Sequence, residues 1–232
     1  MSDRGLRIED LCLAVGEREL FADFALAVPP GEIITVMGPS GCGKSSLLSY
    51  VCGTLEPAFR ARGRVWLDGI EVQGLPPEQR RIGVLFQDDL LFPHLSVGEN
   101  LAFALTPSVR DRKARRARIE AALREADLEG FADRDPATLS GGQRARIALM
   151  RTLLAEPRAL LLDEPFGRLD VELRQRIRSF VFDHARAATL PTLLVTHDPA
   201  DAAAAGGPVV TLGALEESTR LLHLRNSGRR FA

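Results

Sequence analysis

Segments with the hydrophobic pattern of β-strands alternate along this chain with segments that have the pattern of helices. The strand-like segments are residues 6–15, 32–38, 64–69, 81–87, 159–165, 192–198 and 208–213. Residues 33–37 and 159–162 are almost continuously apolar, as expected of strands that are covered on both faces. The alternation therefore predicts an α/β protein built on a central sheet.

A different pattern occupies the middle of the chain, between Thr106 and Asp135. Here the sequence is charged and rich in alanine, and its apolar residues recur on one face of a predicted helix. These residues are Ile119, Ala122, Leu123 and Ala126. The segment predicts a helical subdomain, roughly residues 90–155, inserted between the strands of a single domain that covers residues 1–232.

Composition narrows the class of protein but not its partner. The chain has 232 residues, of which 45% are hydrophobic and 26% charged, and a net charge of -1. This usage is ordinary for a globular protein, and the net charge indicates nothing about partners. No apolar run approaches the length of about 18 residues that spans a bilayer, and the first residues lack the apolar core of a secretory signal. We therefore expect a cytoplasmic protein.

Cysteine usage excludes two kinds of site. The three cysteines, Cys12, Cys42 and Cys52, are odd in number and lack the spacing of metal ligands. The sequence therefore indicates neither a disulfide framework nor a zinc site.

A glycine-rich motif follows the strand predicted at residues 32–38 and precedes an apolar helix. It matches G-x-x-x-x-G-K-[ST] and, with the residue after it, consists of Gly38, Pro39, Ser40, Gly41, Cys42, Gly43, Lys44, Ser45 and Ser46. The glycines let backbone N–H groups point at phosphates, and the helix start favours anions. Lys44 is expected to reach the β- and γ-phosphates of a nucleotide and Ser45 to bind Mg²⁺. A chance glycine-rich turn is the alternative, which the order strand, motif, helix disfavours.

Two acids end the strand predicted at residues 159–165. Asp163 is placed to hold Mg²⁺ through water, and Glu164 is placed beside the γ-phosphate as a general base or water-orienting group. An ordinary acidic turn is the alternative. It becomes the weaker interpretation because a phosphate-binding motif occurs in the same chain.

A second glycine-containing segment precedes another helix. It consists of Leu139, Ser140, Gly141, Gly142 and Gln143. Ser140 is a good N-cap, and the two glycines leave N–H groups exposed, so the segment could bind an anion. A capped helix without a ligand has the same pattern, and the residues alone leave both interpretations open.

The order of these motifs, together with Gln87 and His197, resembles the nucleotide-binding subunits of ABC transporters from about Leu6 to Leu212. The resemblance implies a P-loop ATPase core with a mostly parallel central sheet, an N-terminal antiparallel β region and an inserted helical subdomain. It implies ATP and Mg²⁺ as cofactors. Gln87 then contacts Mg²⁺ or the attacking water, and His197 contacts the γ-phosphate.

The same resemblance implies that the chain works as a dimer. In the family, the segment that matches residues 139–143 caps the ATP held by the opposite subunit, and the segment that matches Gly167 to Asp170 runs between the two sites. We therefore expect Asp170 near the partner's nucleotide, in a head-to-tail homodimer or a dimer with a paralogous cassette.

Two positions depart from the family pattern. Gly167 replaces a common serine, and Val15 stands where many relatives place an aromatic ring against adenine. The first change could weaken a contact across the dimer. The second predicts poorer stacking of the base, unless Phe21 replaces the missing ring.

Residues 87–101 resemble the importer branch of the family, in which this segment receives a separate integral membrane permease. Leu91, Phe92 and Leu95 are the expected contacts, with burial in the core as the alternative. The subunit would then attach to the inner face of the membrane through the permease, which could also engage a solute-binding protein. The length resembles short cassettes without a regulatory domain.

Other functions remain as alternatives at this stage. A non-transport ABC ATPase, acting in translation or DNA repair, usually carries paired cassettes, long coiled-coil arms or zinc modules. This sequence lacks them, and we expect no nucleic-acid partner. An ATP-dependent regulatory protein without hydrolysis is disfavoured by Glu164, Gln87 and His197. A GTPase is disfavoured because the Asn-Lys-x-Asp guanine motif is missing.

Overall fold

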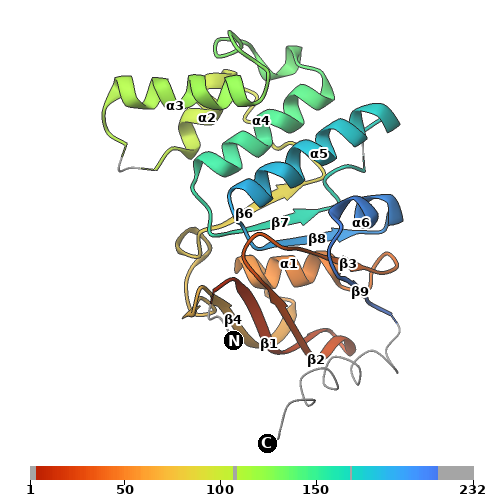
Figure 1. The fold of residues 1–232 in the computed structure, drawn as a ribbon. Helices are drawn as coiled ribbons and strands as arrows, with labels where there is room; N and C mark the ends of the chain where they lie inside the picture. The colour runs from red at the N-terminus through yellow and green to blue at the C-terminus, as the bar shows by residue number, and fades with distance from the viewer. Residues whose placement is uncertain (1–3, 107–108, 168, 214–232) are drawn as a thin grey trace, which may run out of the picture.

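A five-stranded parallel sheet forms the middle layer of the molecule (Figure 1). The structure is a computed structural model, which describes residues 4–106, 109–167 and 169–213. The sheet has the order β6-β7-β8-β3-β9, and each neighbouring pair of strands in it is parallel. Its strands are β6 (Ile82–Phe86), β7 (Ala159–Asp163), β8 (Thr192–Thr196), β3 (Ile33–Met37) and β9 (Val209–Thr211).

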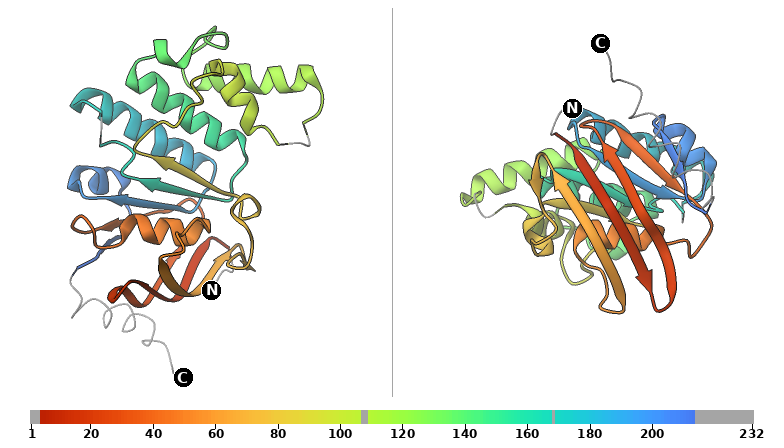
Figure 2. Two further views of the ribbon diagram at one scale, coloured as in Figure 1. Left: turned by 180° about the vertical axis from the view of Figure 1, so that it is seen from behind. Right: turned by 90° about the horizontal axis from the view of Figure 1, so that it is seen from below.

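An antiparallel sheet packs on one side of this layer, as the view from below in Figure 2 shows. Its order is β2-β1-β4-β5, and its strands are β2 (Arg18–Val28), β1 (Leu6–Val15), β4 (Phe59–Leu67) and β5 (Ile70–Glu71). The N-terminal antiparallel region that the family resemblance implies is therefore present. The sequence pattern did not reveal β2 or β5.

Helix α1 (Lys44–Cys52) lies on the same side of the parallel sheet as the antiparallel sheet, and the larger helices lie on the other side (Figure 1). These are α2 (Val97–Ala104), α3 (Arg112–Glu125), α4 (Gly141–Leu154) and α5 (Val171–Ala187), while the short α6 (Pro199–Ala205) follows β8. Two single turns of 3-10 helix lie at Pro77–Gln79 and Pro136–Thr138. On α3, Ala122 and Leu123 are buried and Ile119 packs against the core, as the sequence predicts.

The parallel strands separate two hydrophobic cores because successive side chains point to opposite faces. Leu160 and Leu162 of β7 pack with α4 and α5, whereas Ala159 and Leu161 pack with α1 and the antiparallel sheet. All four side chains are fully buried. The continuous apolar run of β7 is thus explained by burial on both faces.

The predicted fold class is confirmed: a P-loop ATPase core with a parallel central sheet, an antiparallel N-terminal sheet and helices inserted between β6 and β7. Among the described residues, every helix is too short or too polar to cross a membrane.

Candidate functional site

The strand order of the parallel sheet brings the candidate residues to one edge. Carboxyl ends of parallel strands meet at the same edge, where α/β proteins commonly bind ligands. Gln87 follows β6, Asp163 ends β7 and His197 follows β8, while the glycine-rich loop follows β3. Because these four strands are consecutive in the sheet, segments far apart in the sequence become neighbours.

The glycine-rich loop ends at a helix start that is open to an anion. Gly43 has φ 100 and precedes α1, which has no side-chain cap and no acidic residue in its first turn. Backbone N–H groups at such a helix start attract negative charge. The buried Lys44 donates from Nζ to the carbonyl oxygens of Gly38 at 2.8 Å and Pro39 at 3.0 Å, so its ammonium lies across the loop.

Ser45 and Asp163 join the loop to β7. The Ser45 hydroxyl donates to Oδ1 of Asp163 at 3.1 Å. Burial raises the pKa of the Asp163 carboxyl, and the neighbouring Glu164 carboxylate raises it further, while the Ser45 hydrogen bond and the Lys44 charge lower it. A positive ion beside Asp163 would offset this penalty, because an opposite charge favours the ionised carboxylate.

The donor set at this point fits Mg²⁺, which prefers oxygen ligands and keeps water and substrate phosphate among them. Ser45 offers a hydroxyl and Asp163 a carboxylate. Within the described part of the chain, no group of three or more His, Cys, Asp and Glu residues could hold a metal ion alone. A cation here would therefore depend on phosphate oxygens and water to complete its shell.

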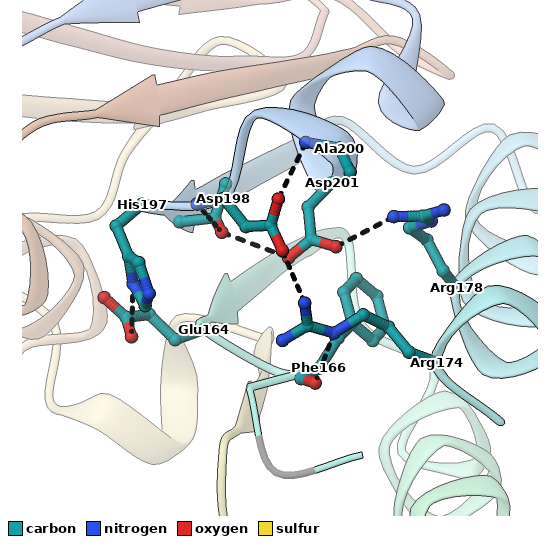
Figure 3. A network of polar contacts seen from close by, with 9 residues as sticks. Glu164, Phe166, Arg174, Arg178, His197, Asp198, Ala200 and Asp201 are labelled. Carbon is teal, nitrogen blue, oxygen red and sulfur yellow. Dashed lines mark hydrogen bonds and ion pairs between the residues drawn. The ribbon is translucent and has the colours of Figure 1, made fainter. Parts of the chain in front are cut away.

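Glu164 and His197 face each other at the ends of β7 and β8. Oε2 of Glu164 lies 3.1 Å from Nδ1 of His197 (Figure 3). The backbone of Glu164 has φ 46, a conformation that costs energy for a residue other than glycine and is common at functional sites. Its N–H donates to the Val195 carbonyl at 2.9 Å, which fixes it against β8. The Glu164 carboxylate and the His197 imidazole therefore lie side by side at this edge of the sheet.

A cavity of about 630 Å³ opens in front of the glycine-rich loop, Asp163 and Glu164, and His197 is not among the described residues that line it. Its wall contains these residues singled out in the sequence: Val15, Ser40, Gly41, Gly43, Lys44, Ser45, Ser46, Gln87, Asp163 and Glu164. It also contains Asp88 and Leu90 from the importer-like segment, and Arg18, Leu20, Phe59 and Phe86, which no sequence motif identified. The volume is in the range of small-ligand sites.

Phe59 is the aromatic ring of this wall nearest to Val15 in the sheet. The two residues are directly paired across β4 and β1, and both line the cavity. Phe21, the sequence-based alternative, is 3% exposed, packs in the core behind the loop and is not among the described residues that line the cavity. Phe59 could not be identified from the sequence, because its pairing with Val15 depends on the register of two strands about forty residues apart.

Residues 139–143 and Asp170 do not join the cavity wall, as far as the described residues show. Ser140 caps α4 in a capping box: its N–H donates to Oε1 of Gln143 at 2.9 Å, and its Oγ accepts from the Gln143 N–H at 3.3 Å. Gly142 packs on α5, where an added Cβ would lie 2.4 Å from Leu173. Asp170 caps α5 by accepting from the Leu173 N–H.

Gly167, the departure from the family pattern, lies next to the Gln87 side chain. A Cβ at this position would lie 2.9 Å from Nε2 of Gln87, the far end of a flexible and exposed side chain that could move aside. Arg168, which follows in the same motif, lies outside the described residues.

The residues expected to contact a permease are only half-buried, and others nearby are more exposed. Leu91, Phe92 and Leu95 each keep part of their surface, whereas Leu90 is 56% and Phe103 70% exposed. The Phe103 ring meets the Phe92 ring edge to face at 4.9 Å. Phe103 lies on α2, and the sequence did not single it out.

A protein-family model described as ABC transporter matches residues 21–167, more than half of the chain. The chain belongs to the ABC transporter family. ATP binding and hydrolysis by the cassette follow from this membership and from the phosphate-binding loop, so the protein is an ATPase.

Curated relatives agree with this assignment. The cassette is 50% identical over 196 residues to the uncharacterized ABC transporter ATP-binding protein YnjD of Escherichia coli (strain K12), covering 84% of this chain and 90% of that protein. It is 39% identical to the sulfate/thiosulfate import ATP-binding protein CysA of Gloeobacter violaceus and 38% identical to the Fe(3+) ions import ATP-binding protein FbpC of E. coli (strain K12). Those matches cover 88% and 85% of this chain, but the cassette spans only 59% and 56% of these two proteins.

Solved structures also resemble the cassette. The dimeric structure of the ATP-binding cassette MJ0796, in a post-hydrolysis state with ADP and Pi, matches with a TM-score of 0.74 and 29% identity. The match covers 89% of this chain and 94% of that one.

Proposed function

We propose that this chain is the nucleotide-binding subunit that powers solute uptake through a separate integral membrane permease, to which it attaches at the cytoplasmic face. The single observation that carries the ATPase part is one cavity with the glycine-rich loop, Asp163 and Glu164 at the edge of the parallel sheet. Uptake is supported by the relatives named as import proteins for sulfate/thiosulfate and Fe(3+). The solute itself would be selected by the permease or by a solute-binding protein.

The loop and its helix would hold the phosphates of ATP. Lys44 starts from its position across the loop and would turn its ammonium to the β- and γ-phosphates. Ser45, Asp163 and Gln87 would hold Mg²⁺, which supplies positive charge beside the phosphate oxygens. Glu164 would orient the attacking water and accept its proton, and His197 would contact the γ-phosphate.

The segment 139–143 would act on the nucleotide of a partner subunit. It does not line its own cavity within the described part of the chain, and Ser140 presents an exposed helix start. In a head-to-tail pair, this start and Asp170 would complete the partner's site, and the similarity to a dimeric cassette supports that arrangement. The partner would be a second copy or a paralogous cassette. The working unit of each subunit would be one domain, residues 1–232, with the helical subdomain at 90–155.

Phe59 would contact the adenine ring in place of the missing aromatic residue at position 15. Its ring lines the cavity wall next to Val15. Aromatic faces stack well on flat rings.

The permease would contact a patch formed by Leu90, Phe92 and Phe103, called the Phe103 patch below. Leu90 and Phe103 are exposed apolar side chains, and Leu90 also lines the nucleotide cavity. The Phe103 patch therefore adjoins the nucleotide cavity, so binding or loss of ATP there would be felt by the permease.

Glu164→Gln tests the catalytic assignment. The amide keeps the shape of the side chain but cannot accept a proton, so we expect kcat to fall at least about 100-fold while ATP affinity is kept. With ATP, the variant should accumulate as a dimer in size-exclusion chromatography. Lys44→Ala is the matched control, because it should lose ATP affinity and remain monomeric. A Glu164→Gln protein that hydrolyses ATP at the wild-type rate would contradict the assigned role.

A further inference from the structure

Arg174 joins the two turns that carry the proposed catalytic pair. It lies in the first turns of α5, close to the end of β8 and the turn after β7 (Figure 3). Its Nε donates to the carbonyl oxygen of Phe166 at 2.9 Å, and its Nη1 forms an ion pair with Asp198. One guanidinium thus binds the turn after Glu164 and the residue after His197 at the same time.

The first partner of Arg174 is rigidly held. The Phe166 ring is fully buried and meets the Phe182 ring of α5 edge to face at 5.6 Å. The turn itself is closed by the Gly167 N–H, which donates to the Glu164 carbonyl at 3.2 Å. A movement of this turn would therefore carry the Phe166 carbonyl, and the guanidinium bound to it.

The second partner is also fixed in orientation. The Asp198 carboxylate accepts from the Ala200 N–H at 2.8 Å and caps α6. The Asp198 N–H donates to the Thr196 hydroxyl at 3.0 Å, and that hydroxyl donates to the buried Asp201 at 3.1 Å. The backbone on both sides of His197 is therefore held by this set of bonds.

The His197 side chain has little support of its own. It is 63% exposed, and its polar contact within the described part of the chain is with Glu164. The position of the ring then depends on the backbone that Thr196 and Asp198 hold.

We propose that Arg174 is a positioning residue for hydrolysis, which sets the place of His197 relative to Glu164 through Asp198 and couples it to the turn at Phe166. This inference rests on the proposed roles of Glu164 and His197. Gly167 belongs to the turn at Phe166, and Asp170 caps the start of α5. Both are residues that would face a partner subunit, so approach of the partner would move His197 through the same guanidinium.

Arg178 offers a matched control one helical turn further along α5. It pairs with Asp201 of α6 at 3.1 Å and is more buried than Arg174, with 14% of its side chain exposed against 24%. Among the described residues, its side chain bonds to Asp201 and to neither Phe166 nor Asp198. Loss of Arg178 should therefore weaken the packing of α5 and α6, while Asp201 still accepts from the Thr196 hydroxyl and Asp198 keeps its ion pair with Arg174.

The test compares Arg174→Ala, Arg174→Lys and Arg178→Ala in the full chain by ATP affinity, kcat at saturating Mg-ATP and melting temperature. Arg174→Ala should bind ATP as the wild type does and lose at least about tenfold in kcat, since small misplacement of catalytic groups is costly. The kcat of Arg174→Lys should lie between those of the wild type and Arg174→Ala, because one ammonium cannot bind Phe166 and Asp198 with the geometry of a guanidinium. Arg178→Ala should lower the melting temperature and keep kcat close to the wild-type value.

A double-mutant comparison separates this inference from the proposed function. In a His197→Ala background, Arg174→Ala should cause no further loss of kcat. If His197→Ala is slow but Arg174→Ala behaves like Arg178→Ala, the inference is wrong and the catalytic assignment stands. If His197→Ala hydrolyses ATP at the wild-type rate, the role of His197 is wrong and the inference falls with it.

Discussion

Burial and charge act in opposite directions on Asp163. Desolvation and the neighbouring Glu164 raise the pKa of its carboxyl, so the ionised form is disfavoured in the folded protein. The proposed role of Asp163 nevertheless requires that ionised form beside Mg²⁺. A residue kept for function in this way lowers the stability of the nucleotide-free protein.

Asp163→Asn should therefore stabilise the nucleotide-free protein and abolish hydrolysis. The folded pKa lies above the unfolded value, so the folded state binds this proton more tightly, and the contribution to stability falls as pH rises through the raised pKa. We expect a gain of about 1 kcal/mol near neutral pH that shrinks on acidification. Thermal melts at a series of pH values from neutral down to the ordinary pKa of an aspartate, about 4, measure the difference. Asp133→Asn, at an exposed position, is the control; an equal gain there would contradict the explanation.

Phe59 supplies a second prediction about a single residue. Phe59→Leu should weaken ATP binding by about 1 kcal/mol, since stacking on the base is lost while the phosphate contacts remain. Affinity for inorganic triphosphate, measured by competition, should not change. Phe24→Leu is the control, because Phe24 belongs to the same antiparallel sheet but packs against Phe21 in the core. Equal loss of affinity for both ligands would show that Phe59 does not contact the base.

Sequence reasoning identified the loop that would bind phosphate and missed the Phe59 ring. Lys44 and Ser45 belong to a motif of adjacent residues, so the sequence alone is enough to identify them as candidates. Phe59 reaches the cavity only through pairing with β1, which no local pattern encodes.

At the scale of elements, β2 shows why one strand escaped prediction. Phe21 and Phe24 of β2 pair with Leu13 and Leu11 of β1, so the inward residues are three positions apart in one strand and two in the other. The extra residue coincides with Asp23, whose φ is 54. Such a bulge breaks the alternation of period two by which strands are recognised.

The loop before α2 is held by one side chain. Asn100 is fully buried, accepts from the Phe92 N–H at 2.8 Å and donates to the carbonyls of Phe92, Leu95 and Ser96. These bonds replace the regular structure that the loop lacks. They hold Phe92 against Phe103 and so give the Phe103 patch a fixed shape.

Phe103→Ser should separate the subunit from its permease. Removing the exposed ring takes apolar area from the contact, and loss of one aromatic anchor typically costs about 2 kcal/mol or more in an interface. Tagged protein purified from native membranes in mild detergent with ATP should bring down a polytopic membrane protein, detected by mass spectrometry, and Phe103→Ser should lose it. Ile70→Ser is the control, because Ile70 is 52% exposed on the antiparallel sheet. Recovery of ribosomal or DNA-bound proteins alone would contradict the transport assignment.

At the scale of the whole molecule, the site depends on a strand order that the sequence does not state. The motifs identify Gln87, Asp163 and His197, but nothing in them says that β6, β7, β8 and β3 lie side by side in that order. Connections that must pass over the faces of the sheet restrict the possible orders without selecting one. The fold class came from the family resemblance, because composition carries no information about the order of strands in a sheet.

The helix start at Ser140 and the cavity in front of Asp163 lie in different places of the same chain. In the proposed pair, a subunit damaged at Ser140 would keep its own pocket intact and spoil the site of its neighbour, whereas one damaged at Lys44 would spoil its own. Two differently damaged chains could then complement each other at one of the two sites. In a cell that makes wild-type and Ser140-substituted chains together, mixed pairs would carry one impaired site. The substitution would therefore lower transport even in the presence of wild-type protein, which in genetic terms makes it dominant.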